Sequence, residues 1–183
     1  KDSFKVIHFG ALGQANGAMY IIEAAKLLKE KNDIEFVFIG GGATEKKLID
    51  SCKFNNLNNV FFLGAFSMKI VSELVNVCDV SVVTFKNLPI LYTNSPNKLF
   101  DSLSAGKPII VNSNGWTREL VEDNNCGFYV NPERPIELVE KILFLKENDL
   151  EKQIMGVRSR NLAEKKYDKN ILCKEFSSVL NKF

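Results

Sequence analysis

The sequence is poor in the residues that build metal centres and disulfide frameworks. Its 183 residues include a single histidine, His8, and four scattered cysteines without a C-x-x-C pair. Because zinc sites need clustered cysteine and histidine ligands, we expect no metal in this chain. Unpaired thiols are typical of a reducing compartment, which favours a cytoplasmic protein.

Long apolar runs and an excess of charge of one sign are also missing. No apolar stretch approaches the ~20 residues that cross a membrane, and the formal net charge is only +2. We therefore expect no transmembrane segment and no nucleic-acid partner, and any phosphate binding must be local. Residues 1–5 lead directly into an apolar run, so no signal peptide is expected.

Two familiar phosphate-binding fingerprints are absent as well. The glycines at 10, 13 and 17 do not match G-x-G-x-x-G, and no acidic residue ends the apolar run 34–39. This argues against a nicotinamide cofactor, because such sites need that turn and a carboxylate for the ribose. There is no G-K-[ST] loop either. A receiver-type signalling domain would need an acidic cluster after the first strand, and none is present.

What the sequence has is a regular alternation of short apolar runs and amphipathic helical patterns. Strands are expected at 4–9, 34–39, 60–63, 80–84, 108–111 and 127–130. Helices are expected from about 17 or 18 and at 44–54, 67–77, 95–106, 116–121, 135–146, 150–166 and 170–182. Buried strands that are each followed by a helix form a parallel sheet covered on both faces. The pattern predicts one α/β domain over 1–183, a doubly wound, Rossmann-like sheet of about six strands.

Glycine-containing turns follow three of the expected strands, at 10–17, 40–42 and 64, and an irregular loop at 85–94 follows a fourth. In a parallel sheet the carboxyl ends of the strands share one edge, where ligands bind. Each turn taken alone could be ordinary turn geometry. Their shared position predicts a site where the backbone can approach a phosphate closely.

The helix expected from Ser95 is the most informative stretch. Ser95 suits the N-cap position and Pro96 the first helical position, so unpaired N–H groups should face an anion there. Lys98 lies in the first turn, where a cation is unfavourable unless an anion is nearby. Asp101 shares its face. The alternative is a surface helix with an i, i+3 ion pair between Lys98 and Asp101.

Two aromatic residues leave alternatives open. His8 could be a packed, hydrogen-bonded core residue, or it could join a site because it lies near the carboxyl end of its strand. Trp116 could cover an acceptor, or it could anchor a loop to the core.

Several short motifs occur in an order that resembles a known family. They are FGALGQANG at 9–17, FIGGG at 38–42, NVFFLG at 59–64, CDV at 78–80, SPNKLFD at 95–101, AGKPII at 105–110, ELV at 119–121 and CG at 126–127. Together they resemble the carboxyl-terminal, donor-binding half of a retaining family 4 glycosyltransferase with the two-domain GT-B architecture. The Ser-Pro-x-Lys form is most similar to the N-acetylfucosaminyltransferase-like branch of bacterial surface-polysaccharide synthesis, which includes capsule and lipopolysaccharide.

The resemblance implies roles for particular residues. Lys98 would be the catalytic residue that stabilises the leaving phosphate, Asp101 would bind the ribose hydroxyls, and the loop with Phe66 would contact the base. The substrate-binding residues that it implies are Gly10, Gly13, Gln14, Asn16, Gly41, Phe66, Asn94, Ser95, Pro96, Asn97 and Asp101. Three positions depart from the family pattern: Thr93 stands where the first acidic residue is expected, and Ala11 and Asn16 stand where Arg and Lys are usual.

The resemblance also implies a reaction and its partners. The donor would be a UDP, GDP or dTDP sugar, the acceptor a glycan or lipid-linked sugar, and no metal or other cofactor would be needed. The acceptor-binding amino-terminal domain would be absent from this chain, so we expect weak donor binding and no transfer by the chain alone. The longer enzyme, a hexosyltransferase, would be cytoplasmic or peripheral at the inner face of the plasma membrane. The alternative is a non-catalytic module that binds sugar nucleotides.

Overall fold

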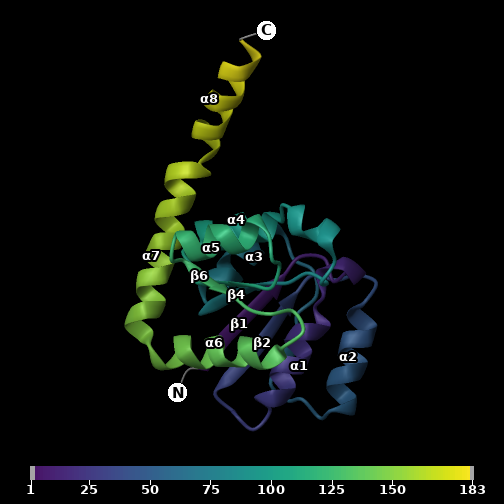
Figure 1. Cartoon of the computed structure of the whole chain (residues 1–183). Coiled ribbons are helices and arrows are strands. Elements are labelled where there is room, and N and C mark those ends of the chain that lie inside the picture. The colour runs from purple at the N-terminus through teal and green to yellow at the C-terminus, as the bar shows by residue number, and fades with distance from the viewer. Residues whose placement is uncertain (1–2, 182–183) are drawn as a thin grey trace.

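The protein is described here by a computed structural model covering residues 3–181, in which a parallel sheet lies between two layers of helices (Figure 1). The strand order is β3-β2-β1-β4-β5-β6, and every pairing is parallel. The strands are β1 (Phe4–Phe9), β2 (Ile34–Ile39), β3 (Val60–Phe62), β4 (Val80–Val83), β5 (Ile109–Val111) and β6 (Gly127–Tyr129). The predicted doubly wound sheet of six strands is confirmed, with strand ends within one residue of expectation.

Helices follow the strands in alternation. They are α1 (Met19–Leu27), α2 (Glu45–Phe54), α3 (Met68–Asn76), α4 (Asn97–Ser104), α5 (Trp116–Asp123), α6 (Pro135–Glu147), α7 (Asp149–Lys166) and α8 (Lys169–Leu180). Two short 3₁₀ helices were not expected, η1 (Gln14–Asn16) and η2 (Pro89–Thr93). The first delays the start of α1, and the second gives helical structure to a loop that the sequence predicts to be irregular. Part of the helix expected at 170–182 lies outside the described residues.

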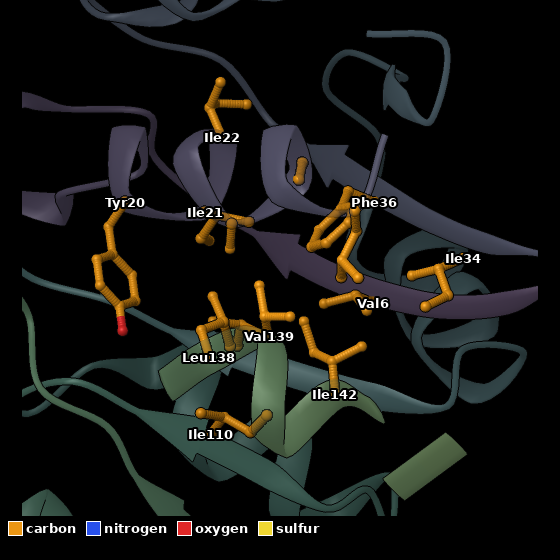
Figure 2. Close-up of a cluster of buried hydrophobic side chains, with 14 of the residues drawn as sticks. Val6, Tyr20, Ile21, Ile22, Ile34, Phe36, Ile110, Leu138, Val139 and Ile142 are labelled. Carbon is orange, nitrogen blue, oxygen red and sulfur yellow. The ribbon is translucent and has the colours of Figure 1, made fainter. Parts of the chain in front are cut away.

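Side chains of the strands alternate between the two faces of the sheet, and both faces are covered. Val6 points to the face beneath α1 and α6, where Ile21 and Leu138 pack against it in one cluster. Figure 2 shows this cluster, with side chains of α1 above those of α6. Burying an aliphatic side chain of this size contributes roughly 1.5–3 kcal/mol to stability. The contacts in this cluster therefore hold α1 and α6 on the sheet.

The opposite face of the sheet is covered by α3, α4 and α5. Ile7, the neighbour of Val6, packs there with Val71 and Val75 of α3. Leu99 of α4 lies in a second cluster on this side and is fully buried. These contacts fix α4 against the sheet, so the first turn of α4 has a defined place at the carboxyl edge.

The chain reverses its winding between β1 and β4, which are adjacent in the sheet but separated in sequence by two other strands. Crevices at such a switch point are where doubly wound sheets bind ligands. The turn after β1 packs directly on the turn after β2, because a Cβ at Gly40 would lie 2.1 Å from the carbonyl oxygen of Gly10. Gly40 has φ +119°, which favours glycine for a second reason.

Helix α8 extends away from the body of the molecule, at the yellow end of the chain (Figure 1). Its N-terminus is capped by Asp168, whose carboxylate accepts hydrogen bonds from the backbone N–H groups of Asn170 and Ile171. None of the residues of α8 is buried.

Candidate functional site

A pocket of about 710 Å³ opens at the carboxyl ends of β1 and β2, beside the start of α4. Its walls come from the turns after these strands, from the loop before α3 and from the first turn of α4. The lining residues are Phe9, Gly10, Ala11, Asn16, Ile39, Gly40, Ala65, Phe66, Met68, Val71, Phe85, Asn94, Pro96, Asn97, Lys98, Phe100 and Asp101. Segments far apart in the sequence therefore meet at the edge where the sequence predicts a site.

Most of the residues implied by the family resemblance lie in this pocket. Those that line it are Gly10, Asn16, Phe66, Asn94, Pro96, Asn97, Lys98 and Asp101, and those that do not are Gly13, Gln14, Gly41 and Ser95. Gly41 links the turn after β2 to the turn after β1, because its carbonyl oxygen accepts a hydrogen bond from the Leu12 N–H at 2.9 Å. Gln14 lies in η1 with its side chain exposed.

The start of α4 differs in detail from the prediction. Pro96, not Ser95, is the N-cap residue, and no side chain caps the helix. Pro96 has φ −80° and ψ 128°, an extended conformation, so the helix begins one residue later, at Asn97. Ser95 is exposed and lies before the cap. Among the hydrogen bonds of residues 3–181, none uses the backbone N–H of Asn97 or Lys98, which leaves both donors available at the pocket.

Lys98 is a largely buried cation in this pocket. Burial lowers the pKa of its ammonium group from 10.5 to about 8. Within the described part of the chain no carboxylate forms an ion pair with it, so the predicted alternative of an ion pair with Asp101 is wrong. Asp101 is half-buried on the same wall, and burial raises the pKa of its carboxyl group. A buried cation without a counter-ion is costly unless an anion joins it.

His8 is a packed, hydrogen-bonded core residue, the first of the two alternatives that the sequence leaves open, and it does not line the pocket. Its ring is buried at 1% exposure, and Nδ1 lies 2.9 Å from the carbonyl oxygen of Val82. Its other nitrogen, Nε2, lies 3.4 Å from Nζ of Lys98. His8 therefore contacts Lys98, a residue of the pocket wall that lies ninety residues away in the sequence.

The turn after β1 has Ala11 and Asn16 at the two positions where the family resemblance implies cations, and the Asn16 side chain is engaged with the backbone. Nδ2 of Asn16 donates to the carbonyl oxygen of Ala11, which closes the turn. Thr84, just after β4, donates from Oγ1 to the carbonyl oxygen of Asn16 at 2.7 Å. These bonds hold the turn against the loop after β4 and shape the pocket wall.

Trp116 anchors a loop. Its Nε1 donates to the carbonyl oxygen of Asn94 at 3.1 Å, and its ring stacks on Phe100 with centroids 6.1 Å apart. Asn94 immediately precedes the segment that starts α4, and so Trp116 fixes the approach of the chain to the pocket. It is not among the residues that line the pocket.

A family model described as glycosyl transferases group 1 matches residues 1–162 of this chain. The chain belongs to this glycosyl transferase family. An uncharacterized glycosyltransferase of Methanocaldococcus jannaschii is 28% identical over 137 residues, which cover 74% of this chain and 34% of the relative. The N,N'-diacetylbacillosaminyl-diphospho-undecaprenol alpha-1,3-N-acetylgalactosaminyltransferase of Campylobacter jejuni is also 28% identical, over 168 residues, covering 91% of this chain and 41% of the relative.

Solved structures agree with the fold. The crystal structure of Anabaena HepE in complex with UDP superposes on the whole chain with a TM-score of 0.88 at 21% identity, and the chain covers 50% of it. The chain spans less than half the length of the curated relatives that it matches. The fold is therefore that of one half of a GT-B glycosyltransferase.

Two features of this pocket were not predicted from the sequence. Asn112, buried after β5, accepts from the Phe85 N–H at 2.7 Å and donates to the Phe85 carbonyl oxygen at 3.0 Å. This pair of bonds fixes Phe85, the second residue after β4, and Phe85 lines the pocket. The sequence signal that could have identified Asn112 is its position as a polar residue directly after an apolar strand, at the edge of the sheet where the pocket lies. Phe9 and Ile39, taken only as strand residues, also form part of the wall.

Among residues 3–181, no group of three or more histidine, cysteine, aspartate or glutamate side chains is arranged to hold a metal ion. The same described part of the chain contains no helix long and apolar enough to cross a membrane.

Proposed function

We propose that this chain is the donor-binding domain of a glycosyltransferase that moves a sugar, with retention, from a nucleotide diphosphate sugar to a glycan or lipid-linked acceptor. The observation that carries the proposal is Lys98, a largely buried ammonium group that has no carboxylate partner among residues 3–181, beside the unpaired N–H groups at the start of α4. A diphosphate supplies the missing negative charge.

The proposed role of Lys98 and α4 is electrostatic. Negative charge develops on the leaving diphosphate as the sugar departs, and preorganised donors stabilise that charge most where water is excluded. The N–H groups of Asn97 and Lys98 add the positive end of the helix dipole. In this proposal the chemistry requires no metal ion. Asp101, on the same wall, would accept hydrogen bonds from the ribose hydroxyls.

The donor is proposed to be a UDP sugar, with GDP and dTDP sugars as alternatives. Structures of HepE hold UDP and UDP-glucose, and about half of each HepE chain has the fold of this chain. Phe66, at 43% exposure beside the pocket, offers a ring on which a base can stack. The sugar itself is proposed to be of the N-acetylfucosamine type, as the family branch implies.

The acceptor is proposed to bind a further part of a longer protein. This rests on the length of the curated relatives, which is more than twice that of the matched region. The Campylobacter relative is named for a diphospho-undecaprenol-linked acceptor, which favours a lipid-linked acceptor in surface-polysaccharide synthesis at the inner face of the plasma membrane. Without the rest of the protein, the chain would bind the donor and transfer nothing.

A non-catalytic module that binds sugar nucleotides is the second candidate. It is favoured by the turn after β1, where Ala11 and Asn16 replace two expected cations and the Asn16 amide is engaged by the backbone. The two candidates differ in the effect of Lys98→Ala in the full-length protein. Transfer should fall by orders of magnitude if Lys98 stabilises the leaving group, and unchanged turnover would favour the second candidate.

Calorimetric titration of this chain tests the binding site directly. UDP, GDP and dTDP are each titrated into the wild type, Lys98→Met and Lys47→Met, the last a matched loss of an exposed lysine on α2. We expect one nucleotide to bind, about tenfold or more weaker binding to Lys98→Met, and no change in Lys47→Met. No heat with any nucleotide at millimolar concentration, or equal binding to Lys98→Met, would remove the proposed site.

A further inference from the structure

His8 lies between two groups with opposite hydrogen-bonding demands. The Val82 carbonyl oxygen, 2.9 Å from Nδ1, can only accept a hydrogen bond, whereas the Lys98 ammonium group, 3.4 Å from Nε2, can only donate one. The ring is buried against Phe38, with ring centroids 5.7 Å apart. Burial therefore keeps the ring nitrogens from bonding to bulk water instead.

One protonation state of the ring satisfies both neighbours. The carbonyl needs a proton on Nδ1, and the ammonium group needs a lone pair on Nε2, so the ring must be the neutral Nδ1–H tautomer. Burial, together with a smaller effect of the Lys98 charge, lowers the pKa of His8 from 6.5 to about 3, although the hydrogen bond to Val82 acts in the opposite direction. The imidazolium form would set an N–H against the ammonium group.

The lysine side chain is held from a second direction by the turn after β1. A Cβ at Gly10 would lie 3.4 Å from Cε and 3.7 Å from Nζ of Lys98. The end of the side chain therefore lies over the Gly10 backbone, and both residues line the pocket. In the described part of the chain, the only side-chain partner of this ammonium group is His8.

We propose that His8 is a positioning residue for Lys98, and that its neutral ring orients the ammonium group over Gly10 without neutralising its charge. The inference rests on the proposed function, in which Lys98 binds the diphosphate. A carboxylate in place of His8 would also hold the lysine, but it would compete with the phosphate for the positive charge. A neutral lone pair fixes direction and leaves the full charge for the anion.

A ligand-free measurement tests the contact first. Because His8 is the only histidine in the chain, ¹⁵N–¹H correlation spectra of the labelled protein show one imidazole ring. We expect a protonated, pyrrole-type Nδ1 and an unprotonated, pyridine-type Nε2 at neutral pH, with the Nε2 shift changing in Lys98→Met. A protonated Nε2, or an Nε2 shift unaffected by Lys98→Met, would overturn the inference whether or not a nucleotide binds.

A pair of substitutions then tests the role in binding. His8→Asn keeps a donor for the Val82 carbonyl but withdraws the acceptor from Lys98, and His8→Gln keeps an acceptor near the Nε2 position. With UDP as the probe, we expect about tenfold weaker binding in His8→Asn and a change below about threefold in His8→Gln. In the Lys98→Met background, His8→Asn should change the affinity less than about twofold, because the two residues act as one unit.

Each outcome has a distinct meaning. An equal loss of affinity from His8→Asn with and without Lys98 would show a general structural effect and overturn the positioning role. Wild-type affinity in His8→Asn would overturn it too. No UDP binding by the wild type would count against the proposed function, while the ring spectra would still decide the contact between His8 and Lys98. Those spectra also decide it if His8→Asn fails to fold.

Discussion

Replacing Lys98 by methionine should stabilise the protein while it removes the binding site. The side chain keeps its length and apolar stem but loses a buried charge. Burial lowers the pKa of Lys98 from 10.5 to about 8. Each pH unit corresponds to about 1.4 kcal/mol, so holding the charged form in the fold costs about 3 kcal/mol at neutral pH.

Part of that gain is offset because Nε2 of His8 loses Lys98, its hydrogen-bond donor in the described part of the chain. Leaving a buried acceptor unpaired costs about 1–2 kcal/mol. The expected net gain for Lys98→Met is therefore about 1–2 kcal/mol in the free energy of unfolding. For a domain of this size that corresponds to a rise in Tm of several degrees, at roughly 2–4 °C per kcal/mol.

The stability difference between Lys98→Met and the wild type should depend on pH in a definite direction. Lys98 binds its proton less tightly in the folded state, so between about pH 8 and 10.5 the unfolded state carries more protons at this site. The contribution of Lys98 to the free energy of unfolding of the wild type therefore becomes more favourable as the pH rises through that window. The penalty is fully present below about pH 8 and is gone above about pH 10.5, so the advantage of Lys98→Met should shrink across the same range.

Urea unfolding followed by circular dichroism at pH 7 and at pH 10 measures both quantities, with Lys47→Met as the control for loss of an exposed lysine. Lys47→Met should stay within about 0.5 kcal/mol of the wild type at both values. A lower stability of Lys98→Met at pH 7, or a gain that does not change with pH, would refute the description of Lys98 as a buried cation without a counter-ion.

Two further predictions concern the backbone around the pocket. Gly40→Ala should cost about 3 kcal/mol or more in urea unfolding and weaken UDP binding, because its Cβ would lie 2.1 Å from the Gly10 carbonyl oxygen. Gly64→Ala is its control: φ is +78° but nothing lies within 4 Å of the added Cβ, so about 1 kcal/mol is expected, and equal losses in the two variants would contradict the close-packing argument. Asn112→Ala should cost about 2 kcal/mol by leaving the Phe85 N–H and carbonyl groups unpaired, and unchanged urea unfolding would show that this clamp contributes nothing.

Local patterns were enough to predict the sheet. Strands such as β2 consist of one apolar run ended by glycines, and the bounds expected for 34–39 are those observed. Hydrophobic periodicity and turn-forming residues act over a few positions of the chain. They can therefore be recognised without knowing the tertiary contacts. The carboxyl edge of the sheet follows from the same information, because parallel strands must end together.

The N-cap residue of α4 was predicted incorrectly. Ser95 and Pro96 match a common pattern for an N-cap followed by the first helical residue, but Pro96 keeps an extended backbone and caps the helix itself. Trp116 fixes the carbonyl of the preceding Asn94. Such a contact with α5 is not contained in any local propensity, and the predicted start of the helix is one residue early.

The sequence by itself determined the order of the elements, the edge of the sheet at which the pocket lies, and the presence of Lys98 and Asp101 on one face of a helix at that edge. Only the tertiary structure decided that these two residues form no ion pair, that Nε2 of His8 faces the ammonium group of Lys98, and that Asn112 holds Phe85 in the pocket wall. The physical reason is distance along the chain. Periodicity fixes which face a side chain takes, but a buried charge acquires its partner and its pKa from groups that folding brings together.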